Sequence, residues 1–343
     1  MQALVLTDYK KFEWKDVPMP ECLPDEVLVQ VKAVGICGSD VHGMDGSTGR
    51  RIPPIIMGHE ASGIISAVGS QVTLWQAGDR VTFDSTIYQL DDWYTRKGYY
   101  NLSDNRMVLG VSCPDFKKNG AFAEYVTVPQ HILYRIPGKV SFEHAAMVEP
   151  VAVAMHAINL TRIALNDTVI VGGAGMISLF LIQLLKLAGC SRIITFDLEQ
   201  ERLDLALKLG ATRAFRVGSV NIPEEVKKLT NGRGADIGFE VVGISPVLKT
   251  VIESVRKGAQ ITLIGNVSKE IEFPLQQVVT RQLTIQGSCA ICGEYEAVLD
   301  LISRKQISMD PLISALAPLE EGASWFTRLY NREPGLMKVI LKP

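Results

Sequence analysis

The sequence predicts an α/β protein of two domains, a mostly-β domain and a doubly wound parallel sheet with helices on both faces. Short alternating apolar runs, punctuated by glycine and proline, fill residues 1 to about 145. From Asp167 onward, strands alternate with helices, as in a parallel sheet that is covered on both sides. The last ~50 residues lose this alternation, and we expect them to return to the first domain. The predicted domains are 1–147, completed by 290–343, and 148–289.

The first domain is best represented by the run from Glu26 to Val34, in which apolar residues alternate and share one face. Turn residues separate such runs at short intervals, which is typical of a barrel-like or sandwich-like domain. These turn residues are Pro18, Pro20, Pro24, Gly35, Pro53, Pro54, Gly63, Gly69 and Gly78.

The second domain alternates strands and helices from a glycine-rich turn onward. A β-rich run precedes the glycines, and a helical pattern follows them and ends at Gly189. The pattern places five side chains on one face of this helix: Ile177, Leu181, Leu184, Leu185 and Ala188. The expected strands are 168–171, 192–196, 237–242 and 260–264, and further helices are expected from Glu199 to Gly210 and from Pro246 to Arg256.

Composition argues against several classes of protein. The 343 residues carry a net charge of −2 and no run of Lys and Arg, so a nucleic-acid surface is not expected. The longest apolar run, Val169 to Leu185, contains glycines and suits a strand, a turn and a helix better than a membrane span. The first residues show no basic segment or cleavage site, so we expect no secretory signal there. Six scattered cysteines favour a reducing compartment, so we expect a cytoplasmic protein with no membrane partner.

A candidate dinucleotide site lies in Gly173-Ala174-Gly175-Met176-Ile177-Ser178, where a strand turns into a helix. Gly173 allows the tight turn, and Gly175 lets the backbone approach a pyrophosphate at the helix N-terminus. The third position, usually glycine, is Ser178, which we expect to shift the helix slightly. Asp197 ends the next strand, where a carboxylate binds the ribose hydroxyls and selects NAD over NADP. The alternative is a glycine-rich turn that binds no nucleotide.

A candidate metal site combines a thiol, an imidazole and two carboxylates: Cys37, His59, Glu60 and Glu149. These are zinc ligands, and three protein ligands leave a fourth position open for chemistry. Each residue alone has a simpler interpretation, as a buried cysteine, a hydrogen-bonded histidine or a solvated acid. Their joint presence beside a nucleotide-binding domain favours a catalytic zinc site.

Five short segments form recognisable motifs: Gly35–His42, Gly58–Gly63, Gly78–Val81, Ala121–Tyr125 and Glu149–Pro150. Together they resemble the zinc-dependent medium-chain dehydrogenases, and most closely the sorbitol or polyol dehydrogenase branch. The resemblance extends over essentially the whole chain, and the first two motifs are the most specific. It implies a GroES-like catalytic domain, a Rossmann domain and an active-site cleft between them.

The resemblance also implies a role for each matching residue. Cys37 and His59 would be catalytic zinc ligands, and Glu60 would be a ligand in some states. Glu149 would be a fourth ligand or would hold a zinc-bound water. Ser39 would relay the substrate proton, and His42 could pass it through the nicotinamide ribose towards solvent. The dinucleotide would contact Gly173, Gly175, Met176, Ile177, Asp197, Arg202, Ile264, Gly265, Asn266, Ser288, Cys289 and Ala290.

One departure from the family concerns a second, structural zinc, which many relatives hold with four cysteines. The corresponding positions here are Gln89, Asp92, Thr95 and Ser103, so all four thiols are missing. Without a soft ligand a structural zinc should not bind, and we expect one zinc per chain. The lobe should instead present a polar, aromatic surface, which could lie at a subunit contact.

A second departure concerns the substrate. Polyol dehydrogenases of this type have an aromatic residue shortly after the position of His42, and Phe-Arg in place of Cys289-Ala290. Gly43 and Met44 follow His42 here, and the hydroxyl-binding arginine is missing. A pocket that lacks both is roomier and pairs fewer polar groups, which argues against sorbitol itself.

The sequence therefore predicts the reversible oxidation of a secondary alcohol, such as a polyol or sugar alcohol, to a ketone with NAD, in a homodimer or homotetramer. A first alternative is a zinc-free NADPH-dependent quinone or enone reductase of the same superfold. Cys37, His59 and Asp197 argue against it, since such a protein needs neither ligands nor a ribose-binding acid. A second alternative is a non-catalytic nucleotide-binding protein, because fold alone does not guarantee activity.

Overall fold

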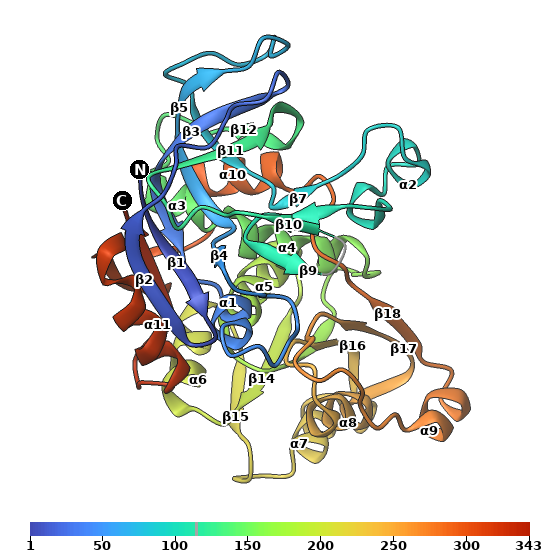
Figure 1. Cartoon of the computed structure of the whole chain (residues 1–343). Coiled ribbons are helices and arrows are strands. Elements are labelled where there is room, and N and C mark those ends of the chain that lie inside the picture. The colour runs from blue at the N-terminus through green and yellow to red at the C-terminus, as the bar shows by residue number, and fades with distance from the viewer. Residues whose placement is uncertain (114–115) are drawn as a thin grey trace. The chain divides into compact units, whose positions relative to one another are not determined.

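The computed structural model describes residues 1–113 and 116–343, which form two compact units (Figure 1). One unit consists of Met1–Glu149 with Ile291–Pro343, and the other consists of Pro150–Ala290. The boundaries expected from the sequence are 147/148 and 289/290. Helix α4 (Val148–Asn159) carries the chain from the first unit into the second.

The first unit is built on a seven-stranded sheet in which β3 pairs with β5, β11 and β20. The two C-terminal strands, β19 and β20, are parallel to each other and complete this sheet. Along the path of the sheet the strands are β12 (Leu133–Arg135), β6 (Arg80–Phe83), β5 (Glu60–Val68), β3 (Glu26–Gly35), β20 (Lys338–Lys342) and β19 (Ile313–Pro318), with β11 (Tyr125–Pro129) beside β3.

The alternation predicted for Glu26–Val34 is confirmed in β3. Val27, Val29 and Val31 are buried and join the core of this unit, while the residues between them are only partly covered. Because side chains of a strand point alternately to its two faces, this period of two directs one face of β3 into the core. The packing of β3 thus fixes the position of its carboxyl end at Gly35, and with it the position of the residues that follow.

Smaller elements surround this sheet. Three strands form one small sheet: β2 (Lys11–Asp16), β1 (Gln2–Asp8) and β4 (Ile55–Ile56). Two antiparallel strand pairs form the other small sheets: β9 (Val111–Cys113) with β10 (Phe116–Lys118), and β7 (Thr86–Ile87) with β8 (Met107–Val108). The helices of the unit are α1 (Gly38–Gly43), α2 (Trp93–Arg96), α3 (Phe142–Ala146), α10 (Tyr295–Ser303) and α11 (Gly322–Tyr330).

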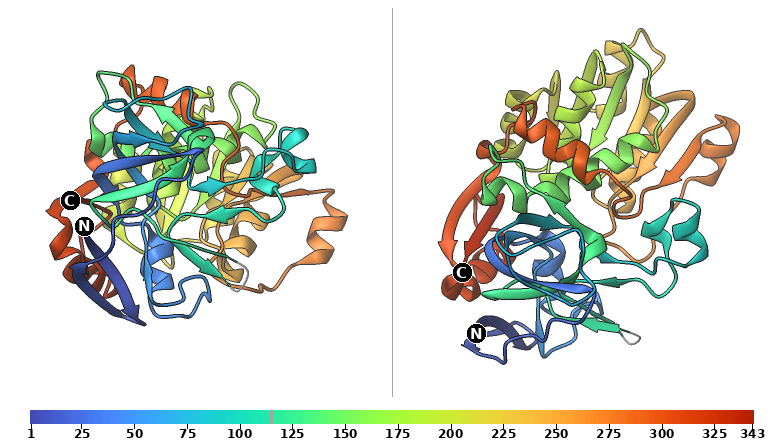
Figure 2. Two further views of the ribbon diagram at one scale, coloured as in Figure 1. Left: turned by 45° about the horizontal axis from the view of Figure 1, so that its top comes forward. Right: turned by 90° about the horizontal axis from the view of Figure 1, so that it is seen from above.

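The second unit is a six-stranded, all-parallel sheet in the order β15-β14-β13-β16-β17-β18, covered by helices (Figure 2). The strand order reverses between β13 and β16, which is where doubly wound sheets bind ligands, outside the carboxyl ends of the strands. Its strands are β13 (Thr168–Gly172), β14 (Arg192–Asp197), β15 (Arg213–Arg216), β16 (Ala235–Glu240), β17 (Val255–Leu263) and β18 (Thr284–Gly287). Its helices are α5 (Met176–Leu187), α6 (Gln200–Leu209), α7 (Ile222–Leu229), α8 (Ser245–Ser254) and α9 (Leu275–Thr280).

The four strands expected in this unit are confirmed as β13, β14, β16 and β17 within a few residues. Helix α6 ends where predicted, because Gly210 caps it with a φ of +128° that only glycine adopts readily. The face predicted for α5 is only partly right. Every residue from Ser178 to Leu185 is buried, since α5 packs on both the sheet and α6, whereas Ala188 is exposed.

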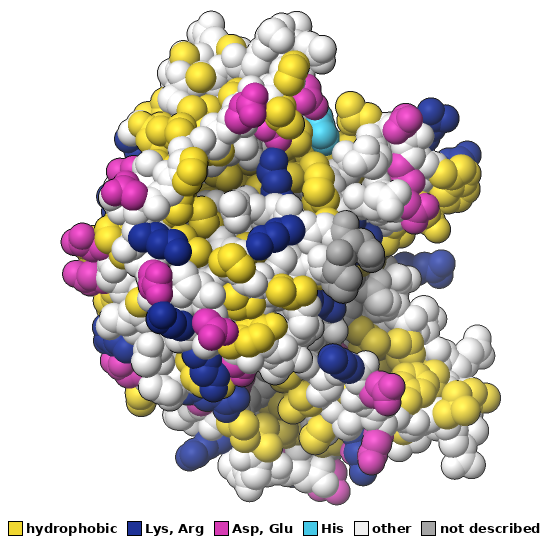
Figure 3. Space-filling model, viewed as in Figure 1, with side chains coloured by type: hydrophobic (Ala, Val, Ile, Leu, Met, Phe, Trp, Pro, Cys, Tyr) yellow, Lys and Arg dark blue, Asp and Glu magenta, His cyan; other side chains and the backbone are white. Residues whose placement is uncertain are grey.

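The apolar run from Val169 to Leu185 is confirmed as a strand, a glycine-rich turn and a helix. Across residues 1–113 and 116–343, no helix is both long and apolar enough to cross a membrane. On the face shown in Figure 3, Lys and Arg side chains are interspersed with Asp and Glu side chains, as the net charge of −2 leads one to expect.

Candidate functional site

The first unit brings three of the four predicted metal ligands together. The side-chain ligand atoms of Cys37, His59 and Glu60 all lie within 4.8 Å of one another. Cys37 follows β3 and caps α1, and Glu60 begins β5. Because β3 and β5 are antiparallel with Gly35 opposite Glu60, the end of one strand meets the start of the other. The register of this strand pair therefore assembles the cluster.

Gly35 makes room for the carboxylate of Glu60. A Cβ at position 35 would lie 2.6 Å from Glu60 Oε2, a distance at which two such atoms clash. The glycine is thus needed for a close approach and not for an unusual backbone angle. The Glu60 carboxylate occupies the space that a side chain at position 35 would fill.

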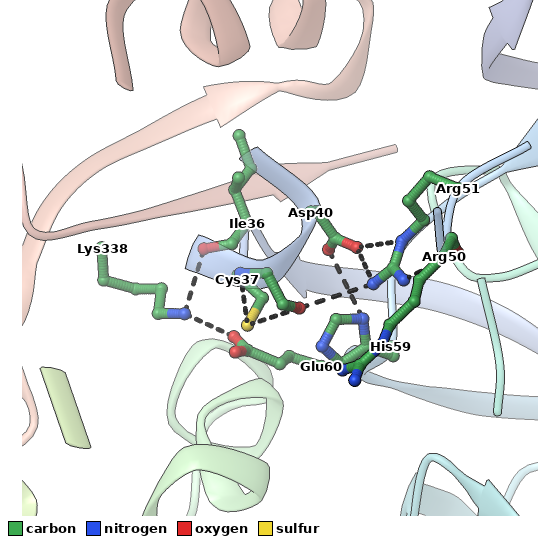
Figure 4. Close-up of polar contacts among 9 residues, drawn as sticks. Ile36, Cys37, Asp40, Arg50, Arg51, His59, Glu60 and Lys338 are labelled. Carbon is green, nitrogen blue, oxygen red and sulfur yellow. Dashed lines mark hydrogen bonds and ion pairs between the residues drawn. The ribbon is translucent and has the colours of Figure 1, made fainter. Parts of the chain in front are cut away.

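Lys338, from β20, is the partner of Glu60 in the structure (Figure 4). Its ammonium group donates hydrogen bonds to Glu60 Oε2 and to the carbonyl oxygen of Ile36, and both charged side chains are almost fully buried. Burial alone would lower the pKa of Lys338, but the nearby Glu60 and Cys37 raise it above its ordinary value. A lysine that remains charged in this interior holds Glu60 in place.

His59 is oriented by a second buried carboxylate. Its Nδ1 faces Asp40 Oδ2 at 3.4 Å, and both side chains are nearly inaccessible to solvent. Arg51 pairs with the other oxygen of Asp40, at 2.7 Å. Burial disfavours the charge on Asp40, but attraction to His59 and Arg51 outweighs burial and holds the pKa of Asp40 well below its ordinary value. With Nδ1 directed at Asp40, Nε2 is the nitrogen of His59 that is available to a metal ion.

The remaining predicted residues of this site lie close by or at its surface. Glu149, at the start of α4, is partly buried, and burial together with the charge of Glu60 raises its pKa to about 7. The hydroxyl of Ser39 donates to Cys37 Sγ at 3.3 Å, and the backbone N–H of Ser39 also points at the sulfur, at 3.5 Å. His42 is exposed in the last turn of α1.

The cluster fits a zinc ion by its donors and by its charge. A thiolate, an imidazole and a carboxylate at these separations are the donor set of a catalytic zinc site. Burial opposes a charge on His59, yet Asp40 and Cys37 raise the pKa of His59 well above its ordinary value, as Glu60 and Cys37 do for Lys338. Asp40 Oδ2 and His59 Nδ1 make no good hydrogen bond within the described chain. The acidic side chains around the cluster thus favour positive charge on their neighbours, and a divalent cation would supply such a charge.

The predicted dinucleotide residues of the second unit lie at one edge of its sheet. Gly173 follows β13 with a φ of +100°, and Gly175 caps α5. The carboxylate of Asp197 accepts the N–H of Ala174 at 2.7 Å and that of Glu199 at 3.0 Å. It therefore fixes the glycine-rich turn and also stands where the ribose hydroxyls of a dinucleotide are expected.

Other predicted contacts follow neighbouring strands of the same sheet. Arg202 lies on α6 and pairs with Glu199 at 3.0 Å. The segments 264–266 and 288–290 follow β17 and β18 directly. Since all six strands are parallel, these segments share the carboxyl edge with the glycine-rich turn. The hydroxyl of Ser288 is buried there without a hydrogen-bond partner in the described chain, as expected of a group that awaits a polar ligand.

The lobe in which many relatives hold a structural zinc, and in which none is expected here, contains hydrogen bonds at all four positions without thiols. Asp92 caps α2 by accepting the N–H of Thr95 at 3.1 Å, and it also accepts the N–H of Asp104 at 3.3 Å. The N–H of Gln89 donates to the hydroxyl of Ser103 at 3.2 Å. Side-chain oxygens of Asp92 and Ser103 thus bind backbone N–H groups of this lobe.

The structure corrects the interpretation of Gly43 as a position that makes the pocket roomier. Gly43 is buried, and a Cβ there would lie 2.6 Å from Cγ of Arg51. The space beside Gly43 is therefore filled by the aliphatic stem of Arg51. Met44, which follows it, is also buried in the core.

Sequence reasoning missed Asp40, Arg51 and Lys338. Asp40 stands inside the Gly35–His42 motif, and a carboxylate beside two candidate ligands was an available signal. Lys338 interrupts an apolar strand, and a lone lysine in such a strand could have suggested a buried partner. Arg51 has no comparable signal, because its contacts depend on the path of the loop after α1.

Comparisons with known proteins agree with this geometry. Residues 23–138 match an alcohol dehydrogenase GroES-like domain, and residues 177–304 match a zinc-binding dehydrogenase. The D-xylulose reductase of Saccharomyces cerevisiae is 31% identical over 353 residues, covering 99% of this chain and 97% of the relative. The sorbitol dehydrogenase of Bacillus subtilis is 31% identical over 347 residues, covering 100% of this chain and 97% of the relative. The crystal structure of galactitol-1-phosphate dehydrogenase from Escherichia coli superposes with a TM-score of 0.92 at 28% identity, covering 100% of both chains.

The fold of the two units and the thiol–imidazole–carboxylate cluster define a zinc-dependent dehydrogenase. The chain belongs to the zinc-dependent medium-chain alcohol and polyol dehydrogenase family, since its identity with these relatives extends over nearly its whole length. It is accordingly an oxidoreductase that acts on a small molecule, and the zinc-free reductase is not favoured.

Proposed function

We propose that this protein catalyses the reversible oxidation of a secondary alcohol of the polyol class to a ketone, with NAD as the hydride acceptor. The observation that carries the proposal is the cluster of Cys37, His59 and Glu60, with ligand atoms within 4.8 Å, in a chain 31% identical to polyol-converting enzymes. The overall change removes a hydride from the substrate carbon and a proton from its hydroxyl, so the chain must provide a place for each.

In this proposal Cys37 and His59 hold the zinc ion, and Glu60 and Glu149 are the carboxylates that complete its surroundings. Glu60 is paired with Lys338 in the structure, whereas Glu149 is a carboxyl with a pKa of about 7. When bound, the zinc ion supplies Lewis-acid catalysis that makes the substrate hydroxyl more acidic. Asp40 would orient His59, and Lys338 would hold Glu60.

The proton of the substrate hydroxyl leaves through Ser39 in this proposal. The Ser39 hydroxyl lies 3.3 Å from Cys37 Sγ, so it is next to one of the proposed zinc ligands. His42 is exposed on the same short helix, and an imidazole there suits a group that passes a proton to solvent.

The second unit would bind the dinucleotide along its carboxyl edge. Gly173 and Gly175 leave the backbone open to a pyrophosphate, and the helix N-terminus of α5 favours its charge. Asp197 would accept hydrogen bonds from the adenosine ribose and repel a 2′-phosphate. Arg202 and the segments 264–266 and 288–290 would line the rest of the site.

A panel assay of purified protein tests the proposal. Hexitols, pentitols, short diols, amino alcohols and a polyol phosphate are each offered with NAD, and NADH formation is measured beside the zinc content. We expect one zinc per chain and turnover of at least one secondary polyol. Zinc-free protein with full activity would contradict the proposal, and zinc-loaded protein that is inactive on the whole panel would favour a non-catalytic nucleotide-binding protein.

Cysteine variants supply the matched control for this assay. Cys37→Ser should lose zinc and turnover together, because a hydroxyl does not replace a thiolate ligand. Cys22→Ser changes a thiol of the same unit whose Sγ contacts the carbonyl of Glu26, and it should keep both. Activity that persists in the Cys37→Ser preparation would identify a contaminating dehydrogenase or exclude this ligand.

We also propose a cytoplasmic location and a homodimer or homotetramer. None of the six cysteines, all of which lie within the described residues, forms a disulfide, which suits a reducing compartment. Cell fractionation tests the location, and light scattering of the zinc-loaded protein tests the assembly. A monomer in solution would contradict the proposed assembly.

A further inference from the structure

Arg51 is a buried arginine that contacts two residues of the candidate zinc site. Its side chain is 4% exposed, and that of its partner Asp40 is 0% exposed. Nε and Nη2 both donate to Asp40 Oδ1, at 3.0 and 2.7 Å, and Nη2 also reaches the hydroxyl of Ser39 at 3.4 Å. Nη1 donates to the backbone carbonyl of Arg50 at 3.1 Å, which fixes the plane of the guanidinium group.

Through these contacts the guanidinium group of Arg51 holds both the carboxylate of Asp40 and the hydroxyl of Ser39. Figure 4 shows Arg51 beside Asp40. Asp40 faces His59 Nδ1 with the oxygen that Arg51 leaves open, so the angle of its carboxylate sets the orientation of the imidazole. Ser39 in turn donates to Cys37 Sγ. A planar guanidinium can serve both neighbours at once because its donors diverge at fixed angles, which an ammonium group cannot reproduce.

Gly43 is the residue that lets Arg51 reach this position. A Cβ at Gly43 would lie 2.6 Å from Arg51 Cγ and 3.5 Å from Arg51 Cβ. These atoms belong to the base of the side chain, which cannot move away without withdrawing the guanidinium group. The backbone of Gly43 has no positive φ, so an alanine there is strained only by Arg51.

We propose that Arg51 is a positioning residue of the zinc site: it holds Asp40 so that Asp40 orients His59, and it holds the hydroxyl of Ser39 beside Cys37. The inference rests on the proposed zinc-dependent function. It adds that the geometry of the zinc site depends on the guanidinium group of Arg51 and on the absence of a side chain at Gly43. Outer-shell partners of this kind change metal affinity or activity by about 10- to 100-fold when they are removed.

Zinc affinity, measured by competition with a chelator, is the first readout. Arg51→Ala should weaken zinc binding about 10- to 100-fold. Arg51→Lys should recover part of this loss, because an ammonium group can pair with Asp40 but cannot also reach Ser39. Gly43→Ala should weaken zinc binding in the same direction, and it should have no further effect in the Arg51→Ala background, where the clashing Cγ is absent.

The second readout separates positioning from general stability. In Co²⁺-substituted protein the visible ligand-field spectrum should change in Arg51→Lys and Gly43→Ala, and kcat should fall while the KM for NAD stays unchanged. Lys118→Ala is the matched control, because it truncates another ion pair of the same unit, with Glu26 at 2.8 Å, far from the zinc ligands in the sequence. It should keep the zinc affinity and the cobalt spectrum of the wild type.

Each outcome decides the matter. If Arg51→Ala proves unfolded, Arg51→Lys and Gly43→Ala, which keep the buried charge, still give the zinc affinity and the spectrum. Wild-type zinc affinity, spectrum and kcat in both of these variants would overturn the inference and leave the proposed function intact. Wild-type protein that binds no zinc at all would overturn the proposed function, and the inference with it.

Discussion

At the scale of single residues, the candidate site depends on a glycine as much as on its ligands. Gly35 lies opposite Glu60 across two strands, and any side chain there would meet Glu60 Oε2. Glu60 would then have to leave Lys338 or turn towards the metal position. The residue without a side chain therefore controls the position of a charged one.

Gly35→Ala should lower zinc affinity and kcat by roughly tenfold or more, because displacement of the Glu60 carboxylate changes the surroundings of the metal. Chelator competition and steady-state kinetics measure the two effects. Gly138→Ala is the matched control, since a Cβ at Gly138 meets no atom within 4 Å and should change neither quantity. An unaltered zinc site in Gly35→Ala would show that Glu60 can move without consequence.

Asp84 is a buried acid whose protonation couples stability to pH. It accepts the N–H of Thr86 at 2.8 Å and the hydroxyl of Tyr100 at 2.9 Å, yet burial raises its pKa from 3.8 to about 6. Between these two values the folded protein holds a proton at Asp84 that the unfolded chain releases. Its contribution to stability is thus fully present below about pH 4 and is lost as the pH rises through about 6.

The stability of Asp84→Asn relative to the wild type should therefore increase as the pH rises. The difference in unfolding free energy between variant and wild type should shift towards the variant by up to about 3 kcal/mol from pH 4 to pH 7, since one pKa unit corresponds to about 1.4 kcal/mol. Denaturant unfolding at equal zinc loading measures it. A difference that stays constant over this range would mean that Asp84 titrates normally.

The same scale shows which parts of the site the sequence can predict. Cys37 and His59 can be predicted because both are residue types that bind zinc and they lie close together in the sequence. Lys338 is separated from Glu60 by 278 positions, so only the pairing of β20 with β3 brings it to the site. Arg51 depends on a loop path and on a vacant space beside Gly43, and neither is visible in a pattern of residue types.

At the scale of elements, periodicity predicts those structures whose environment is simple. Buried and partly covered residues alternate along β3 because one of its faces meets the core, and the predicted run from Glu26 to Val34 lies within the observed strand. α5 departs from its predicted face, because packing on both the sheet and α6 buries residues around most of its circumference. A one-sided helical pattern cannot anticipate a second covering layer. The pattern also groups Ala188 with the predicted face, although Ala188 caps the exposed end of the helix.

The lobe around α2 gives the prediction for this scale. Asp92→Ala removes the acceptor for the N–H groups of Thr95 and Asp104, so these two amides should exchange hydrogen severalfold faster as the helix cap is lost. Amide exchange followed by mass spectrometry measures the change, and zinc content should stay at one per chain. Asp91→Ala, at the neighbouring exposed acid, is the control. Loss of zinc in Asp92→Ala would mean that the lobe holds a metal after all.

At the scale of the whole molecule, the two units divide the proposed chemistry. The cluster of metal ligands lies in the unit formed by 1–149 and 291–343, and the glycine-rich turn lies in the unit formed by 150–290. Each unit has its own sheet and its own buried core. Zinc binding and dinucleotide binding should therefore be separable by substitution.

A reciprocal pair of variants tests this separation. Cys37→Ser should lose zinc but still bind NADH within about twofold of the wild type, because it leaves the carboxyl edge of the parallel sheet unchanged. Asp197→Ala should keep zinc, while its preference for NAD over NADP falls by roughly tenfold or more, the size expected for hydrogen bonds to a charged group. NADH fluorescence titration, kcat/KM with both dinucleotides and zinc analysis measure the three properties.

Asp197 also holds the N–H groups of Ala174 and Glu199, so the control for its substitution must keep those bonds. Asp197→Asn retains an oxygen acceptor and loses the charge, which isolates the repulsion of a 2′-phosphate from the shape of the turn. If Asn and Ala variants relax dinucleotide preference alike, charge is the cause. If only the Ala variant relaxes it, the shape of the turn sets the dinucleotide preference. Loss of NADH binding in Cys37→Ser would show that the zinc site and the dinucleotide site depend on each other.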